Sequence, residues 1–137
     1  MSLVFDASVA LAWALPDEDS PLAQEAFERI AADGGWASGI WRLEVANGLQ
    51  MSIRRGRITA AFRDGVLADL RELPIVVDDE TDTHAWDATL ALADRFGLTP
   101  YDASYLELAA RRNLPLATLD RDLRAAGRKL GIALLGV

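Results

Sequence analysis

Cysteine is absent from this chain, and histidine and lysine occur once each, as His84 and Lys129. Without cysteine there is no disulfide framework, no Cys-ligated zinc or iron–sulfur site and no cysteine nucleophile. A single histidine excludes multi-histidine metal sites and two-histidine nucleases, and serine–histidine hydrolysis would have to be built around His84. We therefore expect any chemistry in this protein to depend on carboxylates, and we assign His84 no function.

Positive charge is scarce as well. The chain has 14 Lys and Arg against 21 Asp and Glu, a formal net charge of -7, and a surface of this sign repels nucleic acid and anionic membranes. A polyanionic partner therefore needs a local basic patch or a metal ion. The apolar stretch at residues 9–15 is too short to span a membrane and lacks the basic flank of a signal peptide. We expect no membrane association and, since cysteine is absent, a cytoplasmic location.

The chain of 137 residues, 51% of them hydrophobic, is long enough for one domain with a sizeable core. Short apolar runs alternate in it with segments of helical periodicity. We expect strands at residues 3–5, 36–38, 75–77, 114–118 and 132–135, and helices at residues 8–15, 20–33, 40–55, 59–73, 83–96, 100–112 and 120–126. The β-branched run at 75–77 is typical of a buried parallel strand. This order predicts a single α/β domain over residues 1–137, with a central, mostly parallel β-sheet flanked by α-helices on both faces.

Acidic residues follow the expected strands with regularity. Asp6 ends the first strand, Asp78 and Asp79 end the third, and Asp120 and Asp122 follow the fourth. Ligands of α/β sheets bind beyond the carboxyl ends of the strands, so these positions are candidates for a site. Each also has a structural interpretation, because Asp is favoured at helix N-termini, where it accepts a backbone N–H bond.

Two further acids lie within expected helices. Asp102 comes three residues after Thr99, an arrangement close to a capping box that accounts for it structurally. Glu44 shares a helical face with Ile40, Leu43, Asn47 and Met51. A carboxylate in such a largely apolar stripe needs a cation, which is either a metal ion or an arginine such as Arg42 or Arg55.

If Asp6, Glu44, Asp102 and Asp120 meet at one sheet edge, their mutual repulsion must be neutralised. Hard divalent cations with oxygen ligands do this, and a site without Cys or His favours Mg²⁺ or Mn²⁺ over zinc. Such sites typically serve phosphoryl chemistry, in which metal ions activate water and stabilise the leaving oxygen.

Four segments carry these acids: VFDASVAL at 4–11, EVANGL at 44–49, YDASYLELA at 101–109 and TLDRDL at 118–123. In this order and spacing they resemble the motifs of PIN-domain ribonucleases, and most closely those of the VapC-type toxins of bacterial toxin–antitoxin pairs. The resemblance runs from the first expected strand to the last expected helix.

The resemblance implies a PIN-like fold and Mg²⁺-dependent endonucleolytic cleavage of RNA, with Mn²⁺ as a substitute ion. Matched by position, Asp6 and Asp102 would be the principal metal ligands, and Glu44 would complete the cluster or orient water. Asp120 would act through metal-bound water, with Asp122 as the alternative to Asp120. The supporting polar groups would be Ser8, Asn47 and Thr118.

The resemblance also implies two partners besides RNA: a VapB-type antitoxin whose tail covers the acidic site, and a second copy of the chain in a homodimer. The apolar stripes of the helices at 40–55 and 59–73 offer a groove for an antitoxin helix. Candidates for RNA contact are two basic clusters and four aromatic side chains. They are Arg54, Arg55 and Arg57; Arg121, Arg124, Arg128 and Lys129; and Trp13, Trp41, Tyr101 and Tyr105.

Two other functions compete with this one. A haloacid-dehalogenase-like phosphatase would use Asp6 as nucleophile. That chemistry requires a second Asp where this chain has Ser8, and a well-placed lysine, whereas Lys129 is the only lysine in the chain. A PIN-like domain without activity would serve only as a binding module. Acids at all four positions argue against that, because a carboxylate cluster is costly to retain without a use.

Overall fold

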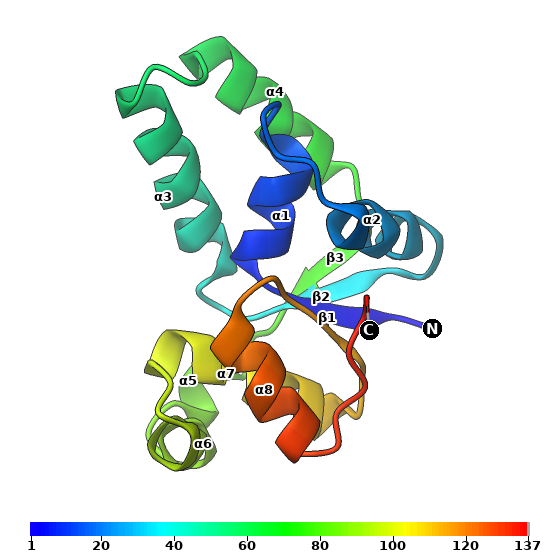
Figure 1. Ribbon diagram of the computed structural model, residues 1–137, viewed down its shortest axis with the longest axis vertical. Helices are drawn as coiled ribbons and strands as arrows, with labels where there is room; N and C mark the ends of the chain where they lie inside the picture. Colours follow the sequence, from blue (N-terminus) through cyan, green and yellow to red (C-terminus); the bar gives the residue numbers. More distant parts are fainter. Residues whose placement is uncertain (137) are drawn as a thin grey trace.

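The computed structural model describes residues 1–136 (Figure 1). One to three helices follow each strand along the chain, in the order β1 (Leu3–Phe5), α1 (Ala7–Ala14), α2 (Pro21–Asp33), β2 (Gly35–Ala37), α3 (Trp41–Arg54), α4 (Ala60–Arg71), β3 (Ile75–Val77), α5 (Thr81–His84), α6 (Ala88–Phe96), α7 (Pro100–Arg112), β4 (Leu116–Ala117) and α8 (Arg121–Lys129). Among the described residues no helix combines the length and apolar character that crossing a bilayer requires.

The strands form one parallel sheet in the order β3-β2-β1-β4. Val4 of β1 lies between Trp36 of β2 and Leu116 of β4, so β1 is a central strand. Figure 1 shows α1 to α4 on one side of the sheet and α5 to α8 on the other. The predicted α/β architecture with helices on both faces is thereby confirmed.

The core forms around β1. Leu3, Val4 and Phe5 are fully buried, and the Phe5 ring contacts Phe27 and Trp41 edge to face at centroid distances of 5.6 and 5.3 Å. On the other side of the sheet, every residue of α7 from Ala103 to Ala109 is buried. The strand that leads to Asp6 and the helix that carries Asp102 are therefore both fixed in the interior.

The prediction of a buried strand at residues 75–77 is wrong in one respect. β3 is parallel, but it pairs only with β2 and lies at the edge of the sheet, so Val76 is 47% exposed. A β-branched apolar run is typical of parallel strands in general and does not tell a central strand from an edge strand.

Two other predicted elements differ from the structure. The expected helix at 83–96 is split into α5 and α6, because Asp87 adopts a non-helical backbone (φ -113°, ψ -99°). The expected strand at 132–135 is reduced to a single parallel bridge between Leu116 and Leu134, and the expected strand at 114–118 is reduced to the two residues of β4. The remaining expected elements are present, with ends that differ by a few residues.

Candidate active site

The candidate site lies where β1 and β4 end and α1 and α8 begin. Asp6 follows β1 and caps α1, because its side chain accepts the backbone N–H of Val9 at 3.3 Å. Asp120 follows β4 and caps α8 in the same way, accepting the N–H of Leu123 at 2.9 Å. The structural and the functional interpretation of these two residues are thus compatible, since capping occupies only part of each carboxylate.

The four predicted acids line one pocket with a volume of about 320 Å³. Its walls are formed by Asp6, Ala7, Ser8, Leu11, Glu44, Asn47, Gly48, Asp102, Tyr105 and Asp120. Asp122, the alternative to Asp120, is exposed on α8 and is not part of the lining. We refer to this feature as the acidic pocket.

Asp6 is the most enclosed of the four acids, with 5% of its surface exposed. The Ser8 hydroxyl donates to its Oδ1 at 2.5 Å, and the buried Thr118 hydroxyl donates to its Oδ2. Burial raises the pKa of Asp6 to about 6 although these hydrogen bonds lower it, and the neighbouring charge of Asp102 raises it further. Ser8 and Thr118, predicted as supporting groups, hold the Asp6 carboxylate in place.

Glu44 has a different partner from the predicted arginines. The Tyr105 hydroxyl donates to its Oε1 at 2.6 Å. Burial raises the pKa of Glu44, the Tyr105 hydrogen bond lowers it, and the charge of Asp102 raises it. Burial together with the Glu44 hydrogen bond raises the pKa of Tyr105 above its usual range, so Tyr105 remains a donor.

The largely apolar stripe of α3 that carries Glu44 does not face the core. Leu43 and Met51 on its face are exposed, whereas the buried residues of α3 are Trp41, Val45, Leu49 and Ser52. The face with Glu44 therefore borders the acidic pocket rather than the core. The sequence does not reveal that Tyr105 holds Glu44, although the position of Tyr105 three residues after Asp102 on α7 places these two on one helical face.

Asp102 occupies the first turn of α7, where Thr99 caps the helix by accepting the Asp102 backbone N–H at 3.1 Å. Burial raises the pKa of Asp102, and the charges of Asp120 and Asp122 add to this effect. Burial and neighbouring negative charge thus raise the pKa of three acids of the pocket, Asp6, Glu44 and Asp102. This donor set fits a hard divalent cation, which would relieve the repulsion.

A second group of acids, Asp78, Asp79 and Glu80, lies beyond the end of β3. Their carboxylate oxygens lie within 4.8 Å of one another, which no three of the four acids of the acidic pocket achieve among residues 1–136. Mg²⁺ commonly keeps several of its water ligands, so an ion in the wider acidic pocket would be held partly through water.

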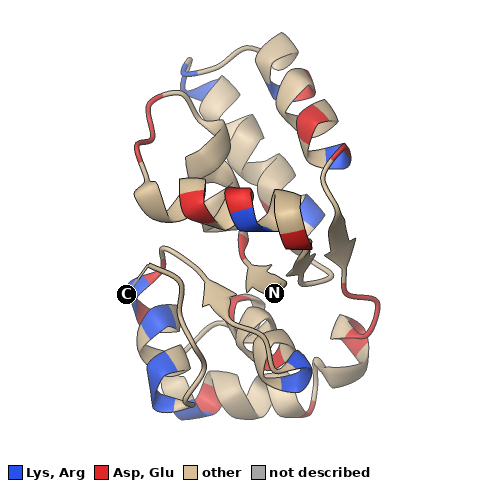
Figure 2. Cartoon of the chain, turned by 90° about the vertical axis from the view of Figure 1, so that its right-hand side faces the viewer, with Lys and Arg blue, Asp and Glu red and all other residues tan. Residues whose placement is uncertain are grey.

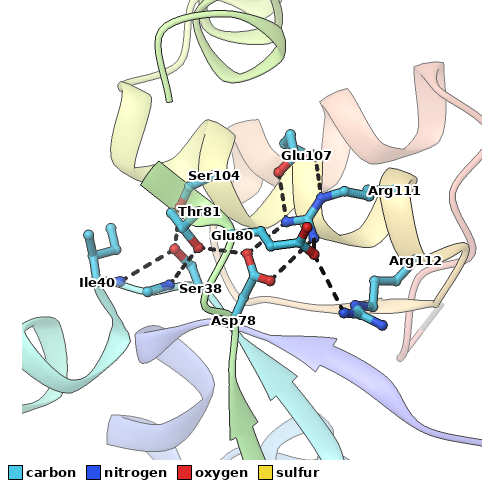
Figure 3. Close-up of polar contacts among 10 residues, drawn as sticks. Ser38, Ile40, Asp78, Glu80, Thr81, Ser104, Glu107, Arg111 and Arg112 are labelled. Carbon is cyan, nitrogen blue, oxygen red and sulfur yellow. Dashed lines mark hydrogen bonds and ion pairs between the residues drawn. The ribbon is translucent and has the colours of Figure 1, made fainter. Parts of the chain in front are cut away.

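Two members of the second acidic group, Asp78 and Glu80, are paired with arginines, as Figure 3 shows. Arg111 donates to both oxygens of Asp78, at 2.7 and 3.2 Å, and to both oxygens of Glu107, at 2.9 and 3.1 Å. Burial raises the pKa of Asp78, but the hydrogen bonds from Arg111 and Thr81 outweigh this and hold it below its usual value. Asp78 therefore serves to join β3 to α7 and is not brought to the acidic pocket.

The aromatic candidates for RNA contact mostly belong to the core. Trp13 stacks on Phe27 with ring centroids 4.3 Å apart, and Trp41 and Tyr105 are buried. Only Tyr101 of these four candidates has a largely exposed ring.

Two of the basic candidates are held by contacts within the chain. Arg57 pairs with Asp17, and Arg124 donates to the backbone carbonyls of Thr118 and Leu135. Figure 2 shows the two basic clusters at the end of α3 and along α8. The exposed members of these clusters are Arg54, Arg55, Arg57, Arg121, Arg128 and Lys129.

The parallel sheet, with carboxylates gathered at the carboxyl ends of its strands, defines an α/β protein whose acidic pocket is suited to a hard cation. A family model described as "PIN domain" matches residues 3–129, and the chain belongs to this family. The membership confirms the predicted resemblance and removes the haloacid-dehalogenase-like alternative.

The chain is also similar to individual proteins. It is 33% identical over 123 residues to Ribonuclease VapC3 of Pyrobaculum aerophilum, an alignment that covers 90% of this chain and 92% of VapC3. The crystal structure of PAE2754 from the same organism has a TM-score of 0.66 at 25% identity, covering 98% of this chain and 83% of PAE2754. That of FitAcB from Neisseria gonorrhoeae has a TM-score of 0.66 at 15% identity, with 99% and 97% covered, and supports the fold alone. The predicted PIN-like fold is thereby confirmed.

Proposed function

We propose that this protein is a metal-dependent endoribonuclease and the toxin of a toxin–antitoxin pair, with Mg²⁺ as its ion and Mn²⁺ as a substitute. The observation that carries the proposal is the acidic pocket, in which four carboxylates from separate parts of the chain line one cavity. The 33% identity to Ribonuclease VapC3 supports RNA as the substrate.

A metal ion bound in the acidic pocket would supply Lewis acidity toward the scissile phosphate and would lower the pKa of a water nucleophile. Asp6 and Asp102 are the residues that would hold it. Ser8 and Thr118 fix the Asp6 carboxylate by hydrogen bonds, so that its orientation is set before any ligand arrives.

Glu44 is the group suited to orient water or to accept a proton in this pocket. Tyr105 holds its Oε1, which leaves Oε2 free of hydrogen bonds from the described residues. Asp120 is the fourth acid of the lining, and Asn47 adds a carboxamide to it.

The antitoxin is proposed to bind an apolar groove of about 320 Å³ between α3, α4 and β3. Its lining is Trp41, Arg42, Val45, Ala46, Leu67, Leu70, Arg71, Leu73, Ile75 and Val77. An amphipathic helix fits such a groove, and the free edge of β3 offers backbone groups to an added strand. Homodimer formation is part of the same proposal, and light scattering of the purified protein tests it.

The experiment that tests the enzymatic proposal is cleavage of labelled single-stranded RNA by the purified protein, with Mg²⁺ and with chelator. The Asp6→Asn and Asp102→Asn variants are compared with wild type, and Asp94→Asn, on the exposed surface of α6, is the matched control. We expect metal-dependent cuts that both site variants lose and the control retains. Absence of cleavage by the wild type in Mg²⁺ and Mn²⁺, or equal cleavage by the site variants, contradicts the proposal and leaves the binding-module alternative.

A further inference from the structure

A second pocket adjoins the acidic pocket and has no part in the proposed reaction. Its volume is about 350 Å³, within the range of pockets that hold small ligands. The two pockets share Ser8, Leu11 and Gly48 in their linings, so they form one continuous groove between α1 and α3. The other residues that line the second pocket are Ala12, Leu15, Glu18, Met51, Ser52, Arg55, Arg57 and Leu119.

Two apolar side chains that line this second pocket are partly open to solvent. Met51 on α3 is 40% exposed and Leu119 in the β4–α8 loop is 41% exposed. The Leu119 side chain gives one wall, and its backbone N–H donates to the Ser8 hydroxyl that also holds Asp6. Asn47, in the acidic pocket, donates to the Met51 sulfur at 3.8 Å. Both walls are therefore fixed relative to the acidic pocket.

The far end of the second pocket carries two arginines with different surroundings. Arg57 is paired with Asp17 and lies 4.0 Å from Glu18. Arg55 has no ion pair or side-chain hydrogen bond with any residue in the range 1–136. In a chain with a net charge of -7, Arg55 is thus a cation free to meet an anion at the end of a groove that begins with carboxylates.

The junction between the two pockets depends on Gly48. A Cβ atom at this position would lie 2.4 Å from Cδ1 of Leu11, so only glycine lets α1 and α3 approach this closely without moving that side chain. Along α3, Glu44 and Arg55 are separated by 11 residues, which is roughly 16 Å of helix. The groove is therefore long enough to hold more than one nucleotide.

We infer that the second pocket binds a nucleotide adjacent to the scissile phosphate of a single-stranded RNA, with the base against Met51 and Leu119 and a neighbouring phosphate at Arg55. The inference rests on the proposed ribonuclease function and adds a subsite to it. Along the groove, carboxylates that suit a metal-bound phosphate are followed by an apolar wall and then by a free guanidinium. This order matches the alternation of phosphates and unpaired bases along a single strand. A purely apolar peptide segment would leave Arg55 without a partner.

The test compares Arg55→Gln and Met51→Ala with wild type and with Arg95→Gln, an exposed arginine on α6, as the matched control. Steady-state cleavage of a fluorescein-labelled single-stranded RNA gives kcat and KM, and fluorescence anisotropy in chelator gives binding as a function of salt. We expect each pocket variant to raise KM by roughly threefold to tenfold with kcat unchanged. Loss of one phosphate contact lowers the slope of log K against log salt by about 0.7 for a single strand, so Arg55→Gln changes the slope and Met51→Ala does not.

The outcomes separate this inference from the proposed function. If the wild type neither cleaves nor binds the RNA, the proposed function fails and the inference fails with it. If the wild type cleaves but both pocket variants keep its KM and its salt slope, the subsite is refuted and the ribonuclease stands. If the variants leave RNA binding unchanged and instead weaken binding of the antitoxin, the groove belongs to a protein partner and the inference is overturned.

Discussion

Replacing Asp6 with Asn is expected to stabilise the metal-free protein at neutral pH. Asp6 is buried, and its pKa is about 6 in the folded chain against an ordinary value of 3.8. The folded chain therefore binds this proton more tightly than the unfolded chain does. The stability associated with Asp6 is fully present below pH 3.8 and is lost as the pH rises through about 6.

The size of the effect follows from the distance between these two pKa values. Each pH unit of difference corresponds to about 1.4 kcal/mol, so ionisation of Asp6 costs the folded chain about 3 kcal/mol at neutral pH. Asn keeps the size of the side chain and can still hydrogen-bond to Ser8 and Thr118 while carrying no charge. Asp6→Asn should then raise the free energy of unfolding by up to about 3 kcal/mol at pH 7.5, and by little near pH 4.

Urea denaturation at a series of pH values, in chelator, measures this difference. The control variant Asp94→Asn should show no comparable pH-dependent gain. Added Mg²⁺ should stabilise the wild type at pH 7.5 and should have a much smaller effect on Asp6→Asn, because binding of a ligand to the folded state alone adds to its stability. A variant that is less stable than wild type at pH 7.5, or a difference that does not change with pH, would refute the reasoning.

Two further predictions concern residues that hold acids in place. Arg111→Met leaves Asp78 and Glu107 unpaired, with side chains only 0% and 7% exposed, and should lower the free energy of unfolding by about 3 to 5 kcal/mol in urea denaturation. A loss below about 1 kcal/mol would mean that solvent reaches these carboxylates. Tyr105→Phe removes the hydrogen bond to Glu44 and should weaken Mn²⁺ binding roughly tenfold, as measured by calorimetry, with the circular dichroism spectrum unchanged. Unchanged Mn²⁺ affinity would show that the Glu44 carboxylate held by Tyr105 does not contribute to metal binding.

The sequence is sufficient to predict the α/β class and most of its elements, because apolar runs and helical periodicity are local properties. It does not reveal the strand order. Alternation of strands and helices is the same whether residues 75–77 form a central or an edge strand, so their exposure depends on long-range pairing. The break between α5 and α6 at Asp87 is likewise not predicted, because the helical periodicity of residues 83–96 continues through it.

For the candidate site, the position directly after a strand marks Asp6 and Asp120 as candidate site residues. It marks Asp78 in the same way, although Asp78 lies outside the acidic pocket. The difference arises from partners distant in the chain. Asp78 meets Arg111, which is 33 residues away, whereas Asp6 meets hydroxyl groups that leave its charge unpaired. The hydrogen bond from Tyr105 to Glu44 joins residues 61 positions apart, so a local sequence pattern does not predict it either.

The pairing of β1 with β4 has a consequence for the synthesis of the protein. Asp6 and Thr118 are 112 residues apart in sequence, yet their side chains are hydrogen-bonded to each other. A chain emerging from the ribosome carries Asp6, Glu44 and Asp102 before it has the strand and loop that complete the acidic pocket. Fragments that end before residue 118 lack one wall, so the acidic pocket is assembled only after the segment that contains Thr118 has been synthesised.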